Sequence, residues 1–293
     1  MKPVVSPKDL AYAIGVSESS IKRWVDDGLI VATKTSGGHR RIAIDEVLRF
    51  IRQSQTPIVH PDVLGLPPEA SSSAQDVPVE KTDENLLQAL LTGDAPRARG
   101  LLLSLYLRGH SVASICDGPL SAAMSKIGEL WKHRNGDGIF LEHRASDICI
   151  QALSRIRSMF EPPADGAVAI GGAPPGDSHL LSSLATSVVL ASDGFRAINL
   201  GPDTPIHSFL TAVETHKPTF VWVSISIAQN PRTLSSQMAQ LASELQSLGV
   251  HLALGGVAAG EVKISPDRGV FVGRSMMELV AFATGLNLSG GIH

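Results

Sequence analysis

The sequence predicts a multidomain protein that ends in a doubly wound α/β domain, and three patterns in its 293 residues lead to this prediction. Near the N-terminus, two short helical segments are separated by a turn. In the middle of the chain, Leu, Ala and Ile recur at helical spacing over four segments. From Gly166 onward, apolar strand-like runs alternate with helical segments, which is typical of a parallel sheet covered by helices.

A helix-turn-helix is predicted at the start of the chain. Ser6 is the expected N-cap of a first helix, which Gly15 ends, and Ser17 is the expected N-cap of a second helix, which runs to Gly28. Ser at an N-cap satisfies backbone donors of the first turn, and Gly tolerates the left-handed conformation at a helix end. Two helices joined by this short turn form a helix-turn-helix.

A wing and a third helix are expected to complete this first domain, over residues 1–53. A short ribbon over residues 30–42 turns at Ser-Gly-Gly-His-Arg-Arg, residues 36–41. Asp45 is then expected to cap a helix that ends near Gln53.

The next two regions are predicted to be a linker and a four-helix bundle. Residues 54–82 are rich in Pro, Ser and Ala without sustained periodicity, which favours a linker. Residues 83–163 predict four helices, with Thr82 or Asp83 capping the first and Asp94 capping the second. Their short connections favour an antiparallel arrangement.

The last region, residues 164–293, predicts a Rossmann-like α/β domain. The predicted strands are 167–172, 195–200, 219–226, 250–255 and 269–272. The predicted helices are 179–192, 206–216, 231–248, 257–262 and 275–285.

The distribution of charge indicates which part of the chain meets a polyanion. Residues 1–52 carry nine Lys or Arg and six Asp or Glu, a net charge of +3, whereas the remainder carries a net charge of −6. A basic head on an acidic body favours nucleic-acid binding by the head alone.

Composition also excludes several classes of protein. No apolar run reaches the ~18 residues of a membrane span, and the N-terminus lacks the apolar core of a secretion signal. Cys116 and Cys149 are too far apart to indicate a zinc site or a disulfide framework. We expect a cytoplasmic protein without a membrane partner. Because no catalytic triad, paired carboxylates or phosphate loop stands out, we do not expect an enzyme.

Polar residues and glycines follow the predicted strands, at the carboxyl edge where open α/β sheets bind ligands. Asp177 precedes His179 by two residues, just after the first strand. An imidazole in this place can ligate a metal, while the carboxylate holds its other ring nitrogen. Pro202-Asp203-Thr204 lies beyond the second strand, Ser224 to Gln229 lies at the end of the third, and Gly255-Gly256 lies beyond the fourth.

These residues carry a resemblance to a known family. Asp177-Ser178-His179, Gly201 to Pro205, Ser224 and Gly255-Gly256 resemble the cobalamin-binding module of methionine synthase, of corrinoid carrier proteins and of the CarH/LitR light-responsive repressors. The resemblance implies that His179 is the lower ligand of cobalt and that Gly255, Gly256 and Ser224 border the buried nucleotide tail. The further cofactor-binding residues that it implies are Asp177, Ser178, Ser182, Asp203, Thr204 and Ser226. Ser182 stands where the family pattern has Gly.

The resemblance extends to the predicted bundle and to the head. CarH-type repressors cover the upper face of the cofactor with a Trp, nine intervening residues and then Glu-His, whereas here ten residues lie between Trp131 and Glu142-His143. If Lys132 is the inserted residue, His133 keeps the family spacing and is expected at the upper face of cobalt. The head resembles the MerR-type winged domain. The DNA-binding residues expected on its second helix and wing are Ser19, Ser20, Lys22, Arg23, His39, Arg40 and Arg41.

Together these patterns predict a transcriptional regulator, expected to be a repressor, that binds operator DNA. The resemblance implies that its chromophore is adenosylcobalamin, and light is expected to convert a dark homo-oligomer, a tetramer or dimer, into a smaller or weaker DNA-binding form. Full MerR regulators dimerise through helices that the head lacks, so assembly is expected to come from the cobalamin modules. Two alternatives are light-independent sensing of cobalamin or another tetrapyrrole, and a corrinoid carrier.

Overall fold

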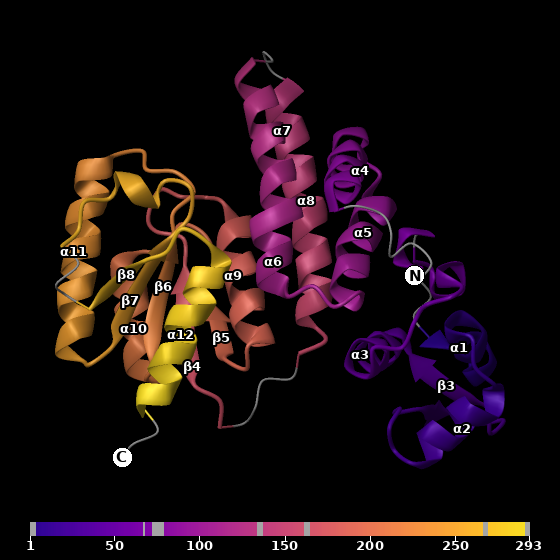
Figure 1. Cartoon of the computed structure of the whole chain (residues 1–293). Helices are drawn as coiled ribbons and strands as arrows, with labels where there is room; N and C mark the ends of the chain where they lie inside the picture. Colours follow the sequence, from indigo (N-terminus) through magenta and orange to yellow (C-terminus); the bar gives the residue numbers. More distant parts are fainter. Residues whose placement is uncertain are drawn as a thin grey trace. The chain divides into compact units, whose positions relative to one another are not determined.

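The computed structural model describes residues 4–66, 68–71, 79–133, 137–160, 165–265 and 269–290. The chain forms two compact units. One comprises Met1–Ser111 and Gly118–Met159, and the other comprises Val112–Asp117 and Phe160–His293. Figure 1 shows the elements of both units along the chain.

The first two helices of the first unit confirm the predicted helix-turn-helix. Helix α1 covers Pro7–Ile14 and helix α2 covers Glu18–Asp26. The Ser6 hydroxyl accepts a hydrogen bond from the Asp9 backbone N–H, and the Asp9 carboxylate accepts one from the Ser6 backbone N–H, so the pair forms a capping box. Gly15 ends α1 with a φ of +71°.

The predicted wing is a small antiparallel sheet with the strand order β1-β3-β2. Its strands are β1 (Val4–Val5), β2 (Thr33–Lys34) and β3 (Arg40–Ala43). Helix α3, Ile44–Ser54, follows β3 directly and buries the apolar side of its first turns in the head.

Asp45 does not cap α3, so that prediction was wrong. Since β3 passes straight into the helix, Ala43 occupies the N-cap position with an extended backbone and makes no side-chain cap. Asp45 instead lies in the first turn, where its Oδ1 is 2.6 Å from the Arg155 guanidinium on the last turn of α8. An acidic side chain in a first turn still favours the helix electrostatically.

The range 54–82, predicted as a linker, is partly folded, and the prediction was wrong for that part. Two short 3-10 turns, η1 (Pro61–Leu64) and η2 (Pro68–Ala70), lie within it. Ile58, Leu64 and Leu66 are buried, and the backbone N–H groups of residues 59 and 60 both donate to the carbonyl of Ala13 in α1. This segment therefore extends the core of the head.

Four helices form the predicted bundle. They are α4 (Val79–Thr92), α5 (Ala95–Leu107), α7 (Ser121–His133) and α8 (Asp137–Arg157). Helix α4 packs against α5 and α7, and α8 packs against the same two helices, so the four close a ring. Asp94 caps α5 as predicted, accepting from the Arg97 N–H. Helix α4 begins at Val79, so Thr82 and Asp83 lie inside it and do not cap it.

The second unit contains the predicted doubly wound sheet. Its five strands are parallel in the order β5-β4-β6-β7-β8. The strands are β4 (Val168–Gly172), β5 (Arg196–Asn199), β6 (Phe220–Ser224), β7 (His251–Gly255) and β8 (Val270–Val272). The helical elements are α9 (Leu180–Ser192), α10 (Ile206–His216), α11 (Pro231–Ser247), the 3-10 turn η5 (Ala259–Glu261) and α12 (Met276–Gly290).

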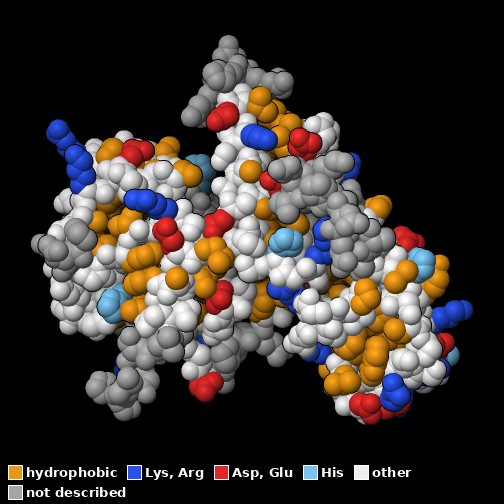
Figure 2. All heavy atoms as spheres, viewed as in Figure 1, with side chains coloured by type: hydrophobic (Ala, Val, Ile, Leu, Met, Phe, Trp, Pro, Cys, Tyr) orange, Lys and Arg blue, Asp and Glu red, His pale blue; other side chains and the backbone are white. Residues whose placement is uncertain are grey.

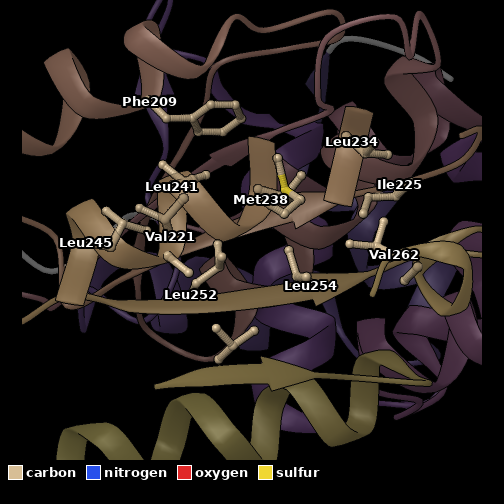
Figure 3. Close-up of a cluster of buried hydrophobic side chains, with 14 of the residues drawn as sticks. Phe209, Val221, Ile225, Leu234, Met238, Leu241, Leu245, Leu252, Leu254 and Val262 are labelled. Carbon is tan, nitrogen blue, oxygen red and sulfur yellow. The ribbon is translucent and has the colours of Figure 1, made fainter. Parts of the chain in front are cut away.

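Alternate side chains of β6 enter the two cores on the two faces of the sheet. Val221 and its neighbours at alternate positions pack with Phe209 of α10 and Leu241 of α11, in the cluster of Figure 3. Trp222 packs on the opposite face. Gly171 of β4 makes room for it, since a Cβ at Gly171 would lie 2.1 Å from the Trp222 ring.

A short segment that precedes the second half of the bundle belongs to the α/β unit. It contains helix α6, Val112–Ile115, and the first residues of a π-helical turn, Cys116–Leu120. Helix α6 packs against α9 and α12. Both carboxylate oxygens of Asp117 accept hydrogen bonds from the N-terminus of α12, from the N–H groups of Met276 (2.7 Å) and Met277 (3.0 Å). Among the helices that the structure describes, none is long and apolar enough to cross a membrane.

Candidate functional site

Asp177 and His179 lie side by side on the loop after β4, at the carboxyl edge of the sheet. The Asp177 side chain is fully buried. Its Oδ1 accepts hydrogen bonds from the ring Nδ1 of His179 at 2.8 Å and from the His179 backbone N–H at 3.0 Å. The predicted pairing of this carboxylate with one ring nitrogen is therefore present.

The second oxygen of Asp177 ties the same loop to the end of β6. Its Oδ2 accepts from the backbone N–H groups of Ser226, at 2.6 Å, and Ile227, at 3.3 Å. Asp203, on the loop after β5, closes the third side: its N–H donates to the Asp177 carbonyl, and its Oδ1 accepts from the Gly176 N–H. Two loops thus hold the Asp177 carboxylate, and Asp203 supports the backbone of the loop that carries the histidine.

His179 has one ring nitrogen available for a ligand. It stands at the N-cap position of α9, and 44% of its side chain is exposed. Because a neutral imidazole that donates from Nδ1 carries its lone pair on Nε2, this nitrogen can bind a metal. Within the described residues, no hydrogen bond is made by His179 Nε2. The arrangement fits a single protein ligand to cobalt, fixed in orientation by Asp177.

Two hydroxyl pairs join α9 to the end of β6. The Ser226 hydroxyl donates to the Ser182 hydroxyl at 3.0 Å. One helical turn further along α9, Thr186 and Ser224 share a hydrogen bond of 3.1 Å, and both side chains are buried. Sequence reasoning missed Thr186, although its spacing of four residues from Ser182 places it on the same helix face. These pairs hold α9 against β6 beside the histidine.

Gly255 is the last residue of β7, and Gly256 begins the turn that follows. Gly256 has a φ of +101°, and a Cβ at this position would lie 2.3 Å from the Ile225 carbonyl oxygen. Gly255 has no such contact, since the nearest atom to its Cβ would be 3.8 Å away. The next residue, Val257, is 91% exposed, and Ile227 at the neighbouring strand end is 42% exposed. Exposed apolar side chains at this edge suit a large, partly apolar ligand.

The other predicted cofactor residues are placed as follows. Thr204 is buried, and its hydroxyl donates to the Gly201 carbonyl, so it stabilises the loop after β5. Ser178 is exposed. In the bundle, Glu142 accepts from the Ser146 hydroxyl and lies 3.6 Å from the Nε2 of His143, which is 75% exposed. Trp131 and His133 lie in the last turn of α7, and their side chains are outside the described part of the chain.

The head brings some of the predicted DNA-binding residues together and separates others. A cleft of about 640 Å³ opens between α1, α2 and the wing, and Lys22, His39, Arg40 and Arg41 line it. Ser19 and Ser20 do not line it: their hydroxyls bond to the capping hydroxyl of Ser17. Arg23 is exposed on α2 outside the cleft.

Comparison with known proteins finds matches to two parts of the chain. A family model described as a helix-turn-helix domain matches residues 4–55, and one described as a B12 binding domain matches residues 82–157. The chain is 22% identical over 280 residues to the HTH-type transcriptional repressor CarA of Myxococcus xanthus, and the match covers 94% of each chain. The solved structure of the monomethylamine corrinoid protein of Methanosarcina barkeri has the same fold as 71% of this chain and is covered completely, with a TM-score of 0.57 and 16% identity.

The winged head, the oriented histidine at the sheet edge and both family models agree on one assignment. These findings support a CarH-like regulator, in which a DNA-binding helix-turn-helix domain is joined to a cobalamin-binding domain.

Proposed function

We propose that this regulator is a repressor that binds adenosylcobalamin through His179 and that light controls its assembly and its grip on operator DNA. The observation that carries the proposal is the His179 ring, whose Nδ1 is held at 2.8 Å by a fully buried carboxylate while Nε2 faces away from that bond. Adenosylcobalamin, when bound, would supply a cobalt–carbon bond that green or blue light breaks.

The residues of the chain have separate tasks in this proposal. Asp177 orients His179 and, through the N–H groups of Ser226 and Ile227, couples it to the end of β6. Val257 and Ile227 offer apolar contact to a ring lying over the sheet edge. On the bundle, Trp131, Glu142 and His143 would contact the cofactor, and His133 would be a second candidate ligand for its metal.

Assembly is proposed to be the switch because a single small head contacts little DNA. Linking several heads through the cobalamin-binding units raises the effective affinity by about 10²–10⁴ without a new contact. Loss of the oligomer on illumination would then release the operator. In this scheme, the head makes the DNA contacts and the cobalamin-binding unit sets how many heads act together.

The test uses the whole chain purified with adenosylcobalamin in the dark. We expect a cobalamin spectrum that changes on illumination, an earlier elution from size exclusion in the dark than in the light, and tighter operator binding in the dark. His179→Ala should lose cobalamin, while His207→Ala, an exposed histidine on α10, should retain it. A His179→Ala protein that keeps an unchanged cobalamin spectrum would show that the ligand assignment is wrong.

The hydroxyl pairs between α9 and β6 favour a second candidate, a regulator that senses cobalamin without light or holds another tetrapyrrole. If the nucleotide tail of cobalamin enters between α9 and β6, it must break the hydrogen bonds of Ser182 with Ser226 and of Thr186 with Ser224. A ligand without this tail would leave both bonds in place. The same spectra distinguish the candidates, because a bound cobalamin with light-insensitive assembly, or a different retained pigment, would favour the second. A corrinoid carrier is disfavoured by the helix-turn-helix head.

A further inference from the structure

The cleft on the head contains charged side chains of both signs. It is bounded by the first turn of α1, by one face of α2 and by the wing. Five Lys or Arg residues line it together with two acidic residues, Glu18 and Asp26. The space-filling view also shows basic and acidic side chains lying close together on the head (Figure 2, lower right). The cleft is net basic, but its two carboxylates compete with DNA phosphates for the nearby cations.

Two of the five cations are engaged by the two acidic residues. Lys22 Nζ lies 2.8 Å from Glu18 one turn earlier on α2, and both side chains are about half exposed. Arg40, on β3, lies 2.5 Å from Asp26. Exposed pairs such as Lys22–Glu18 are weak and exchange readily with water.

The pair between Arg40 and Asp26 differs because a third group takes part. The Arg40 guanidinium also donates to the Lys22 backbone carbonyl at 3.2 Å, and only 22% of its side chain is exposed. Two acceptors on α2 thus hold one guanidinium from the wing. A planar guanidinium can satisfy two acceptors at once, whereas the single ammonium of a lysine acts as a point charge. Arg40 therefore fixes the wing relative to α2, and turning toward a phosphate would break both bonds.

Lys8 and Lys34 have no such partners. Both side chains are exposed, and within the described part of the chain neither makes an ion pair. Lys34 stands directly opposite Arg40 in the β2–β3 register, so the two share a face of the ribbon. Because like charges in opposed positions repel, the Asp26 carboxylate also stabilises this arrangement. Lys8 reaches the cleft from the first turn of α1.

We propose that Lys8 and Lys34 contact DNA phosphates from two sides of the cleft, and that Arg40 is a positioning residue that clamps the wing to α2. Neither lysine was predicted from the sequence. The inference rests on the DNA-binding role of the head. It assigns different functions to three of the five basic residues of the cleft. Salt dependence distinguishes these functions, because each phosphate contact contributes about −0.9 to the slope of log affinity against log salt concentration, and a clamp contributes nothing.

The experiment measures binding of the whole chain to a fluorescein-labelled 30-base-pair duplex of mixed sequence, at salt concentrations from 50 to 200 mM. Lys8→Ala and Lys34→Ala should each make the loss of affinity over this range about 3.5-fold smaller than in the parent protein. Lys126→Ala, an exposed lysine of α7, is the matched control and should change nothing. Arg40→Ala and Arg40→Lys should both weaken binding at every salt concentration with the parent slope.

Asp26→Asn provides an independent route to the same clamp and keeps the test valid if an Arg40 variant does not fold. It should weaken binding and leave the salt slope unchanged, as loss of Arg40 does. Tighter binding with a steeper slope in Asp26→Asn would identify Arg40 as a phosphate contact that Asp26 holds back, and would overturn the proposal. Parent-like slopes in Lys8→Ala and Lys34→Ala would also overturn it. If the parent chain itself does not bind the duplex, the DNA-binding role of the head fails as well.

Discussion

Replacing Asp177 by Ala should loosen both the metal ligand and the end of β6. The change removes an acceptor that binds His179 twice and the N–H groups of Ser226 and Ile227 once each. A hydrogen bond to a charged group contributes about 1.5–3 kcal/mol. The two bonds to the β6 loop would then account for about 3–6 kcal/mol. Because neither Ser226 nor Ile227 is fully buried, water can partly replace the carboxylate, so we expect a loss of about 3 kcal/mol.

Hydrogen exchange followed by mass spectrometry measures the local stability that Asp177→Ala loses. A local measurement is needed because the two units of the chain need not unfold together. A local loss of about 3 kcal/mol speeds exchange about 160-fold in peptides that cover residues 220–230. Cobalamin affinity should fall about 10–100-fold, as is usual when the group that orients a metal ligand is lost. Asp165→Ala, an exposed carboxylate ahead of β4, is the control. Unchanged exchange and affinity in Asp177→Ala would refute the assigned role of this carboxylate.

Three further predictions concern the glycine pair, the hydroxyl contact and a buried thiol. Gly256→Ala should destabilise the α/β unit by at least about 1–3 kcal/mol through backbone strain, and equal unfolding midpoints for Gly256→Ala and Gly255→Ala would contradict this. Ser182→Gly should tighten cobalamin binding about tenfold, because the added serine side chain would crowd the nucleotide tail. Tail-free cobinamide should show no gain in parallel titrations, and equal gains for both ligands would show that Ser182 does not act on the tail. Burial raises the pKa of the Cys149 thiol to about 12, from an ordinary value of 9.0. The neutral thiol thus stabilises the fold at neutral pH, and this stabilisation is lost as pH rises above about 9. Because little thiolate is present at pH 8, labelling by Ellman's reagent should be about a thousandfold slower than for a free thiol. Fast labelling of Cys149 would contradict its burial.

Local signals predicted most of the fold. Ser6, Ser17 and Asp94 cap helices as expected because an N-cap depends on neighbours within three residues. The five strands lie within one or two residues of their predicted limits, since buried parallel strands are continuous apolar runs.

The errors arose where distant residues decide the structure. Asp45 pairs with Arg155, which is 110 positions away, and no local sequence pattern predicts that contact. The proline-rich segment after α3 is folded because Ile58 and Leu64 find a core, although their spacing has no regular period. Single apolar residues in such a segment give no periodic signal, so composition alone indicated a linker.

In the candidate site, too, the local contacts were predicted and the contacts between distant residues were not. The order of Asp177 and His179 on one loop sufficed to predict their pairing, because only Ser178 lies between them. The hydrogen bonds from the β6 loop and the closing contact of Thr186 with Ser224 depend on how helix and sheet pack, which the sequence does not state. The pairing of Asp26 with Arg40 similarly required the register of the wing against α2.

The cap that Asp117 places on α12 has a consequence for how the protein folds during synthesis. Asp117 leaves the ribosome well before Met276 does, since 159 residues separate them. The α/β unit therefore cannot complete its last helix until a segment made much earlier docks against it, and contacts of such large sequence separation form slowly. A fragment that begins at residue 160 would have the five strands but lack this cap. Fragments used to study cobalamin binding should therefore begin before residue 112, and a shorter fragment is expected to leave the start of α12 frayed.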